Sequence, residues 1–178
     1  MNYLKHFIIP FIGLKVGNHS FTFEIEDKFF EHFEYSEIRK GRLHVDCLLE
    51  KQVRMMVLYF DIDGSVRIPC DRCAEEFDQP INGRQKLIVK FGVDHMEESE
   101  DVLVITEKEN ELDVSQFLYE CIHLMLPFKK VHGTDENGNS LCNPEVTRYI
   151  IEKEELPIDP RWEALQKIKD QPNKQENK

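Results

Sequence analysis

The sequence predicts an α+β fold, in which a mainly antiparallel, partly barrel-like sheet is followed by C-terminal helices. Apolar and polar residues alternate in several short segments before residue 106, which is typical of strands with one buried face. Helical periodicity becomes clear only after residue 113. Strands therefore come first and helices last, an order that favours separate layers over the alternating strand–helix units of a parallel sheet.

The first part of the chain is expected to be built from strands. Residues 53–62 are apolar on both faces, which predicts a central strand. Asp63-Gly64 is expected to form a hairpin turn, because this dipeptide favours two-residue hairpin loops. A helical turn or short helix is expected over Asp27 to Phe33. The expected strands cover residues 21–25, 43–49, 53–62, 66–69, 86–93 and 102–105.

The second part is expected to be helical. Asp113 is a good N-cap for a helix over residues 113–126, with Gln116 at the capping-box spacing. Pro127 is expected to end this helix. Asn143-Pro144 and Asp159-Pro160 each place a proline at the first position of a further helix.

These elements predict one domain with a tail. The expected domain covers residues 1–170, strand-rich over 1–106 and helical over 113–170. Residues 171–178 are polar and are expected to be disordered.

The chain is acidic, with a net charge of −11, and one stretch carries most of that charge. Residues 94–113 hold nine acidic side chains and a single basic one, Lys108. Broad non-specific binding to nucleic acid is not expected, because it requires many lysines and arginines. We interpret the stretch first as a solvated surface and second as a docking patch for a basic partner.

The chain is expected to reside in the cytoplasm, without a membrane partner. No apolar run approaches the length of about 18 residues that a membrane span needs. The first ten residues lack the charged leader and cleavage site of a signal peptide. Five cysteines without an export signal indicate free thiols or metal ligands rather than disulfides.

A possible metal site is the first functional hypothesis. Cys70 and Cys73 form a C-x-x-C pair, a spacing at which two thiols bind one tetrahedral ion. His132 and Cys142 lie in a Gly/Asn-rich loop and are candidates for the other two ligands of one structural zinc ion. The alternative is that the pair only faces the edge of the core and that His132 is an ordinary loop residue.

Two further hypotheses are of other classes. Cys70 and Cys73 match the spacing of a thiol–disulfide redox pair, but the expected βαβ pattern is missing and Asp71 would raise a neighbouring thiol pKa. A metal-dependent DNA-binding regulator needs a basic recognition helix, whereas residues 113–126 contain no Lys or Arg. Cys47 and Cys121 fit apolar positions and are expected to fill the core.

A small set of residues is a candidate surface for a partner or for RNA. Basic side chains near the two half-sites would gather on one face if the half-sites met, and could then contact phosphate. The single tryptophan either anchors the last helix or contacts a partner. The candidates are Arg67, Arg72, Lys129, Lys130 and Trp162.

Several short motifs together resemble the YceD family, the bacterial large ribosomal RNA accumulation proteins, which have plant chloroplast relatives. The resemblance covers about residues 1–170 and depends on the order of the motifs. They are Cys70-Asp71-Arg72-Cys73 with the following Glu-Glu-Phe and Pro-Ile, the strand Leu-Ile-Val-Lys-Phe-Gly, the helix end Leu-Met-Leu-Pro, the later Gly-x-x-Leu-Cys-Asn, and Asp-Pro-Arg-Trp-x-x-Leu-x-x-Ile.

The resemblance implies a non-enzymatic cytoplasmic factor for 23S ribosomal RNA accumulation and large-subunit assembly. The implied partners are a large-subunit precursor, its rRNA or a basic ribosomal protein, while the oligomeric state is left open. Many members carry the C-x-x-C and a second cysteine cluster after the helix. Here that cluster is reduced to Cys142, with His132 as the only nearby substitute, so the resemblance alone does not imply zinc in this chain.

Overall fold

The computed structural model describes residues 3–92, 96–99, 101–106 and 108–149. The chain divides into two compact units, residues 1–142 and 143–178. In the second unit, the described residues form a single helical turn, α3 (Pro144–Thr147), which Asn143 caps by accepting a hydrogen bond from the Glu145 N–H at 2.9 Å.

Several expectations fall on residues outside this description. They are the helix starting at Asp159-Pro160, the side chain of Trp162 and the tail over 171–178. The single domain over 1–170 therefore stays a prediction.

The first unit is built around a six-stranded sheet with the strand order β2-β3-β4-β5-β7-β6. Neighbouring strands are antiparallel, except for the parallel pair β5 and β7. The six strands are β2 (Gly17–Ile25), β3 (Lys40–Lys51), β4 (Met55–Pro69), β5 (Glu76–Gly92), β6 (Met96–Ser99) and β7 (Val102–Thr106).

The remaining elements of this unit are short. Two small strands, β1 (Ile8–Pro10) and β8 (Glu111–Asp113), pair with each other in a separate sheet. The helices are the 3₁₀ helix η1 (Tyr3–Phe7), α1 (Asp27–Phe30) and α2 (Ser115–Leu124). No helix among the described residues is long and apolar enough to cross a membrane.

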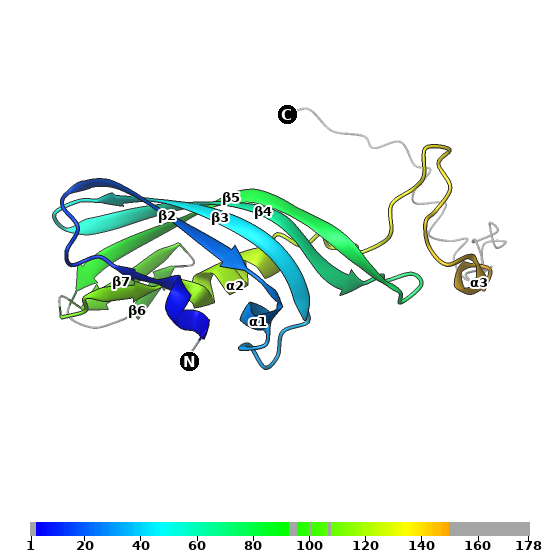
Figure 1. Cartoon of the computed structure of the whole chain (residues 1–178), viewed down its shortest axis with the longest axis horizontal. Coiled ribbons are helices and arrows are strands. Elements are labelled where there is room, and N and C mark those ends of the chain that lie inside the picture. The colour runs from blue at the N-terminus through cyan, green and yellow to red at the C-terminus, as the bar shows by residue number, and fades with distance from the viewer. Residues whose placement is uncertain (1–2, 93–95, 100, 107, 150–178) are drawn as a thin grey trace, which may run out of the picture. The chain divides into compact units, whose positions relative to one another are not determined.

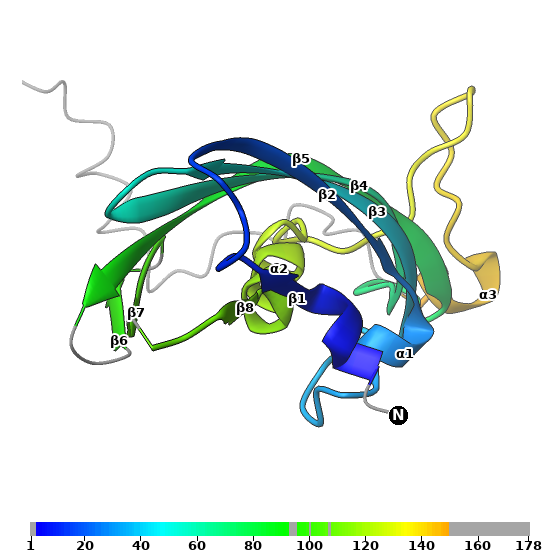
Figure 2. The same ribbon diagram turned by 60° about the vertical axis from the view of Figure 1, so that its left-hand side comes forward.

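The large sheet is curved but open. Figures 1 and 2 show it arching over α2 and the β1–β8 pair, which lie on its concave side. Its edge strands are β2 and β6, and in the described part of the chain they are not joined. The mainly antiparallel sheet is confirmed; it is curved, but it does not close into a barrel, so the expected partly barrel-like form is met only in the curvature.

Alternating burial places one face of the sheet in the core. Along β3, Leu43, Val45, Cys47 and Leu49 are buried while the residues between them are more exposed. The expected strand 43–49 is therefore confirmed.

Helix α2 packs its apolar stripe into the same core. Leu118, Cys121 and Ile122 are buried, and burying a side chain such as Leu118 stabilises the fold by about 1.5–3 kcal/mol. The two core cysteines, Cys47 and Cys121, occupy the apolar positions expected of them. Burial raises the pKa of each of these thiols to about 12.

Phenylalanines close the end of the core near α1. The ring centroids of Phe7 and Phe29 are 4.8 Å apart, and those of Phe29 and Phe30 are 5.4 Å apart in an edge-to-face arrangement. All three side chains are fully buried. The helical turn or short helix expected over 27–33 forms as the single turn of α1.

The expected hairpin turn at Asp63-Gly64 is wrong. Strand β4 continues through this dipeptide, and Gly64 pairs with Leu43 on one side and Ile81 on the other. Gly64 has φ of +147°, and a Cβ built there would overlap the carbonyl oxygen of Arg42. Gly64 therefore allows the backbones of β3 and β4 to approach closely, and it does not form a turn.

Strand β5 is much longer than the expected strand 86–93. It begins at Glu76, and Pro80 lies within it, opposite Ser65 of β4. Strand β7 pairs only with residues 88–92 of β5. Pro80 is therefore on an edge among the described strands, where the missing N–H of proline is tolerated.

Helix α2 begins later than its sequence pattern predicts. Asp113 belongs to β8, where it pairs with Ile8, and its carboxylate accepts a hydrogen bond from the Ser115 N–H at 2.8 Å. Gln116 hydrogen-bonds to Glu120 instead of completing a capping box, so that part of the prediction is wrong. The strand pairing keeps Asp113 extended, and the helix starts only after it.

Replacing Gly64 by alanine should strongly destabilise the protein. We expect a loss of about 2–4 kcal/mol in the free energy of unfolding, since the new Cβ meets the β3 backbone at a positive φ. The measurement is urea denaturation followed by circular dichroism. Gly13→Ala is the matched control, because nothing lies within 4 Å of a Cβ there. Equal stability of the two variants would contradict the packing described for Gly64.

Candidate metal centre

The C-x-x-C pair lies at the tip of the β4–β5 hairpin. Pro69 and Glu76 form the last pair of the ladder, which leaves residues 70–75 as the connecting turn. The Cys70 N–H donates to the Glu75 carbonyl oxygen, and the Ala74 N–H donates to the Cys70 carbonyl oxygen, both at 2.9 Å. Ala74 takes a left-handed conformation with φ of 61°, which closes the turn. The hairpin thereby holds both thiols at one end of the sheet.

A backbone donor in this turn faces sulfur. The Arg72 N–H donates to the Cys70 Sγ at 3.4 Å. Hydrogen bonds of this kind favour the negatively charged thiolate, which is the form that binds metal. The turn is therefore shaped for a ligand thiolate as well as for chain reversal.

Asp71 fixes the second half-site against this turn. Its N–H donates to the Lys130 carbonyl oxygen, and its carboxylate accepts from the Lys130 N–H, both at 2.7 Å. From the sequence, only an effect of Asp71 on a neighbouring thiol pKa is expected. The structure shows instead that it joins residues 59 positions apart along the chain.

A second, small hairpin brings His132 and Cys142 together. The Leu141 N–H donates to the Gly133 carbonyl oxygen at 3.0 Å, and Thr134 and Ser140 form a β-bridge. This hairpin explains how a histidine and a cysteine separated by nine residues can serve one site.

The tip of the small hairpin is closed by Asp135. The Asp135 carboxylate accepts hydrogen bonds from the Asn137 and Asn139 N–H groups at 2.9 and 2.8 Å. The Asn139 side chain and these backbone donors lower the Asp135 pKa. Gly138 takes φ of +84°, as expected in such a turn.

The structure brings all four predicted ligand residues into one cluster. One ligand atom from each of Cys70, Cys73, His132 and Cys142 lies within 4.8 Å of the others. Cys70 Sγ is 3.7 Å from Cys142 Sγ, and His132 Nδ1 is 3.4 Å from Cys73 Sγ and 3.7 Å from Cys142 Sγ. In a tetrahedral centre with metal–sulfur bonds of about 2.3 Å and metal–nitrogen bonds of about 2.0 Å, ligand atoms are about 3.5–3.8 Å apart. The cluster can therefore hold one metal ion.

The thiols of the cluster differ in how readily they ionise. For Cys70, burial raises the pKa. Hydrogen bonds from the N–H groups of Cys73 and His132 lower it by more, and the resulting pKa is about 6. For Cys142, the Ser140 hydroxyl lowers the pKa, while burial and the neighbouring Cys70 and Cys73 sulfurs raise it by more. The cluster can therefore hold one thiolate, at Cys70, without a metal ion. A cation at the centre would favour ionisation of the other thiols.

Apolar side chains cover the cluster, and sequence reasoning missed them. Phe77 and Val131 pack against the three buried cysteines, and the Phe77 ring centroid is 4.8 Å from that of His132. Phe77 follows the C-x-x-C by four residues, and Val131 precedes the histidine. Their places beside the ligands in the sequence were the available signal.

The basic candidate residues are only partly free to contact a partner. Arg67 pairs with Glu76 at 3.1 Å, and Lys130 Nζ pairs with Glu37 at 3.2 Å. Arg72 contacts the Ser140 hydroxyl at 3.4 Å, and Lys129 is exposed. Arg72 and Lys130 lie beside the cluster, as expected, and an RNA contact remains a prediction.

Alkylation should distinguish Cys70 from the two core cysteines. In metal-free protein at pH 8, iodoacetamide is expected to modify Cys70, whose pKa is about 6, while a bound divalent ion should protect it. Cys47 and Cys121 should resist with or without metal, because burial raises each pKa to about 12 and leaves almost no thiolate. Peptide mass mapping with and without a chelator measures this. Metal-independent labelling of Cys70 would contradict its role as a ligand.

Comparison with known proteins found one match. The family model of the large ribosomal RNA subunit accumulation protein YceD matches residues 58–169, which is more than half of the chain. The matched region contains the C-x-x-C turn, helix α2 and the His132–Cys142 hairpin. Searches of curated proteins and of solved structures gave no match. The chain therefore belongs to the YceD family.

Proposed function

We propose that the protein is a non-enzymatic, cytoplasmic factor that supports accumulation of 23S rRNA and assembly of the large ribosomal subunit. The family match over residues 58–169 carries this proposal, because it spans both halves of the Cys/His cluster. The family is that of the large ribosomal RNA subunit accumulation protein YceD.

We propose that the cluster binds one structural zinc ion. Three sulfurs and one imidazole nitrogen at near-tetrahedral separations are ligands that zinc favours. Structural zinc sites use four protein ligands, whereas catalytic sites keep one position for water or substrate. Four protein ligands with all three cysteines buried therefore support a structural role. The ion would lock the β4–β5 hairpin to the loop that starts at Lys130.

Charge favours a protein over RNA as the direct partner. The net charge is −11, and two of the candidate basic residues, Arg67 and Lys130, are already paired with carboxylates. A basic ribosomal protein fits such a surface better than the phosphate backbone does. Direct RNA contact through Arg72 and Lys129 is the alternative.

A thiol–disulfide redox role is the second candidate, and the lowered pKa of Cys70 favours it. Redox pairs of this spacing place the first cysteine at a helix N-terminus, whereas Cys70 lies in a hairpin turn. A zinc ligand needs the same lowered pKa. Variants at Cys73 distinguish the two roles.

Purified protein is expected to contain about one zinc ion per chain, as four protein ligands satisfy one tetrahedral ion. Elemental analysis measures it. A Cys70→Ser, Cys73→Ser double variant should lose the metal, and Cys121→Ala should keep it, because Cys121 lies in the core. Zinc-free protein from a metal-replete preparation would contradict the zinc proposal and leave the family assignment intact.

Deletion of the gene should reduce 23S rRNA and large-subunit particles, measured by sucrose-gradient sedimentation and rRNA quantification. Cys73→Ser should fail to restore them, since it removes a ligand. Cys73→His should restore them, because a Cys₂His₂ set still binds zinc but cannot form a Cys70–Cys73 disulfide. Failure of Cys73→His with zinc still bound would favour the redox role, and normal rRNA on deletion would refute the assembly role.

A further inference from the structure

A large cavity lies beside α2, and none of the four residues of the Cys/His cluster lines it. It has a volume of about 1120 Å³ and is bounded by β5, β7, β8 and α2. Pockets for small molecules are typically about 300–1,000 Å³. The space therefore exceeds that range and is large enough for a peptide segment. We call it the acidic groove.

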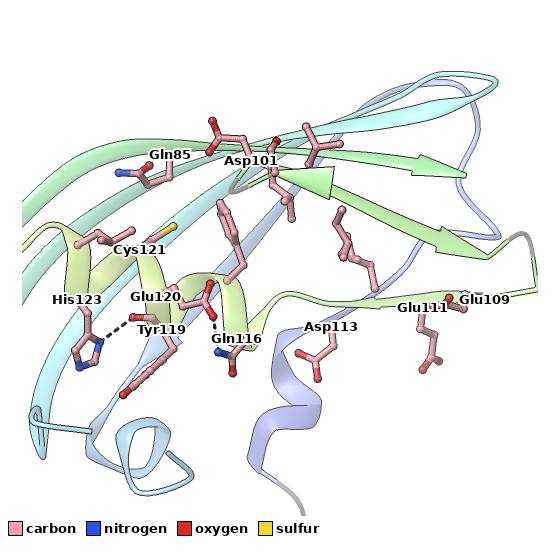
Figure 3. A pocket seen from close by; sticks show the side chains of 17 residues that line it. Gln85, Asp101, Glu109, Glu111, Asp113, Gln116, Tyr119, Glu120, Cys121 and His123 are labelled. Atoms are coloured by element: carbon pink, nitrogen blue, oxygen red, sulfur yellow. Dashed lines mark hydrogen bonds between the residues drawn. The ribbon is translucent and has the colours of Figure 1, made fainter. Parts of the chain in front are cut away.

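Exposed carboxylates surround the groove. Four of them line it: Asp101 beside β7, Glu111 and Asp113 on β8, and Glu120 on α2 (Figure 3). All four residues are exposed, and none of the described residues that line the groove is a lysine or arginine. The groove therefore presents a concentrated negative potential.

The protein's own basic residues pair elsewhere. In the described part of the chain, the ion pairs of lysine and arginine use Glu76, Asp78, Asp61 and Glu37. Asp101, Glu111, Asp113 and Glu120 are not among these partners, so their carboxylates can meet an external cation.

The floor of the groove is apolar. Leu87 and Leu112 are buried beneath it, and Phe117 is half-buried, with its ring 5.4 Å from that of Phe60. Leu124 lines the groove at the end of α2 and is 79% exposed. An occupant can therefore place apolar side chains on the floor and positive ones at the rim, as amphipathic segments do in grooves.

We propose that the acidic groove binds a Lys/Arg-rich segment of a protein partner, with apolar side chains on the face that enters the groove. Charge complementarity selects this occupant over others. Residues 150–178 of this chain contain seven acidic and six basic side chains, so they offer no net positive charge. A second copy, with its own net charge of −11, is repelled. RNA is disfavoured because its phosphates would face carboxylates.

This inference deepens the proposed function and rests on it for one point, the identification of the partner as a basic ribosomal protein. The groove itself stands on geometry and charge. It also assigns part of the acidic stretch over 94–113 to docking, through Asp101, Glu111 and Asp113.

The test is fluorescence anisotropy with a fluorescein-labelled Lys/Arg-rich peptide that carries leucines at helical spacing. The triple variant Asp101→Asn, Glu111→Gln, Glu120→Gln should bind about tenfold more weakly, as three exposed charge pairs are lost. The control Glu24→Gln, Asp46→Asn, Asp63→Asn removes the same charge from the outer face of β2–β4 and should change the affinity less than about twofold. Equal losses of peptide affinity in the triple variant and in the control would contradict the groove as the binding site.

A second pair of variants tests the apolar floor without risk to the fold. Leu124→Ser should weaken peptide binding, and Val53→Ser, at a site 83% exposed, should not. A peptide with serine in place of each leucine should bind the wild-type protein and the Leu124→Ser variant with equal affinity. An unchanged affinity of Leu124→Ser, or direct binding of a labelled RNA oligonucleotide that the triple variant weakens, would overturn the proposal.

The two proposals can fail separately. Groove-dependent peptide binding together with normal 23S rRNA in the deletion strain would refute the assembly role and leave the groove. Reduced 23S rRNA on deletion, with full rescue by the triple groove variant, would refute the groove's role and leave the assembly function.

Discussion

The antiparallel ladder between β4 and β5 is the interaction on which the rest of the structure depends. It runs from Met55 opposite Lys90 to Pro69 opposite Glu76 without interruption. One end of it supplies core residues such as Leu58 and Val89, and the other end supports the C-x-x-C turn. Continuity through Gly64 is essential, because a break there would separate the cluster from the core that holds it. The same strands therefore stabilise the fold and position the ligands.

Charge is distributed to complement this scaffold. At the cluster, sulfurs that cannot all ionise together lie within 4.8 Å, a conflict that a divalent ion removes. At the acidic groove, exposed carboxylates lie around an apolar floor. One site is thus suited to an internal ion and the other to an external chain. Both sites are suited to a positively charged ligand, which is consistent with the net charge of −11.

Local sequence patterns identified the strands with one buried face and the stripe of α2, since burial follows their periods directly. They failed where tertiary contacts decide the outcome. Gly64 looked like a turn but is required by the close approach of β3. Asp113 looked like a helix cap but is held in β8. The four ligand residues were identified by their type and spacing, whereas Asp71, which holds the halves together, shows no distinctive sequence pattern.

The small hairpin between His132 and Cys142 has a consequence for how such centres are recognised. The Thr134–Ser140 bridge and the turn beyond it lie outside the ligand set. Doubling the length of a flexible loop costs only about 0.6 kcal/mol in closure entropy. Chains related to this one are therefore free to lengthen or shorten the hairpin while the ligand atoms stay in place. Sequence searches that require a fixed interval between the third and fourth ligands will overlook such centres, whereas comparison of ligand positions in space will find them.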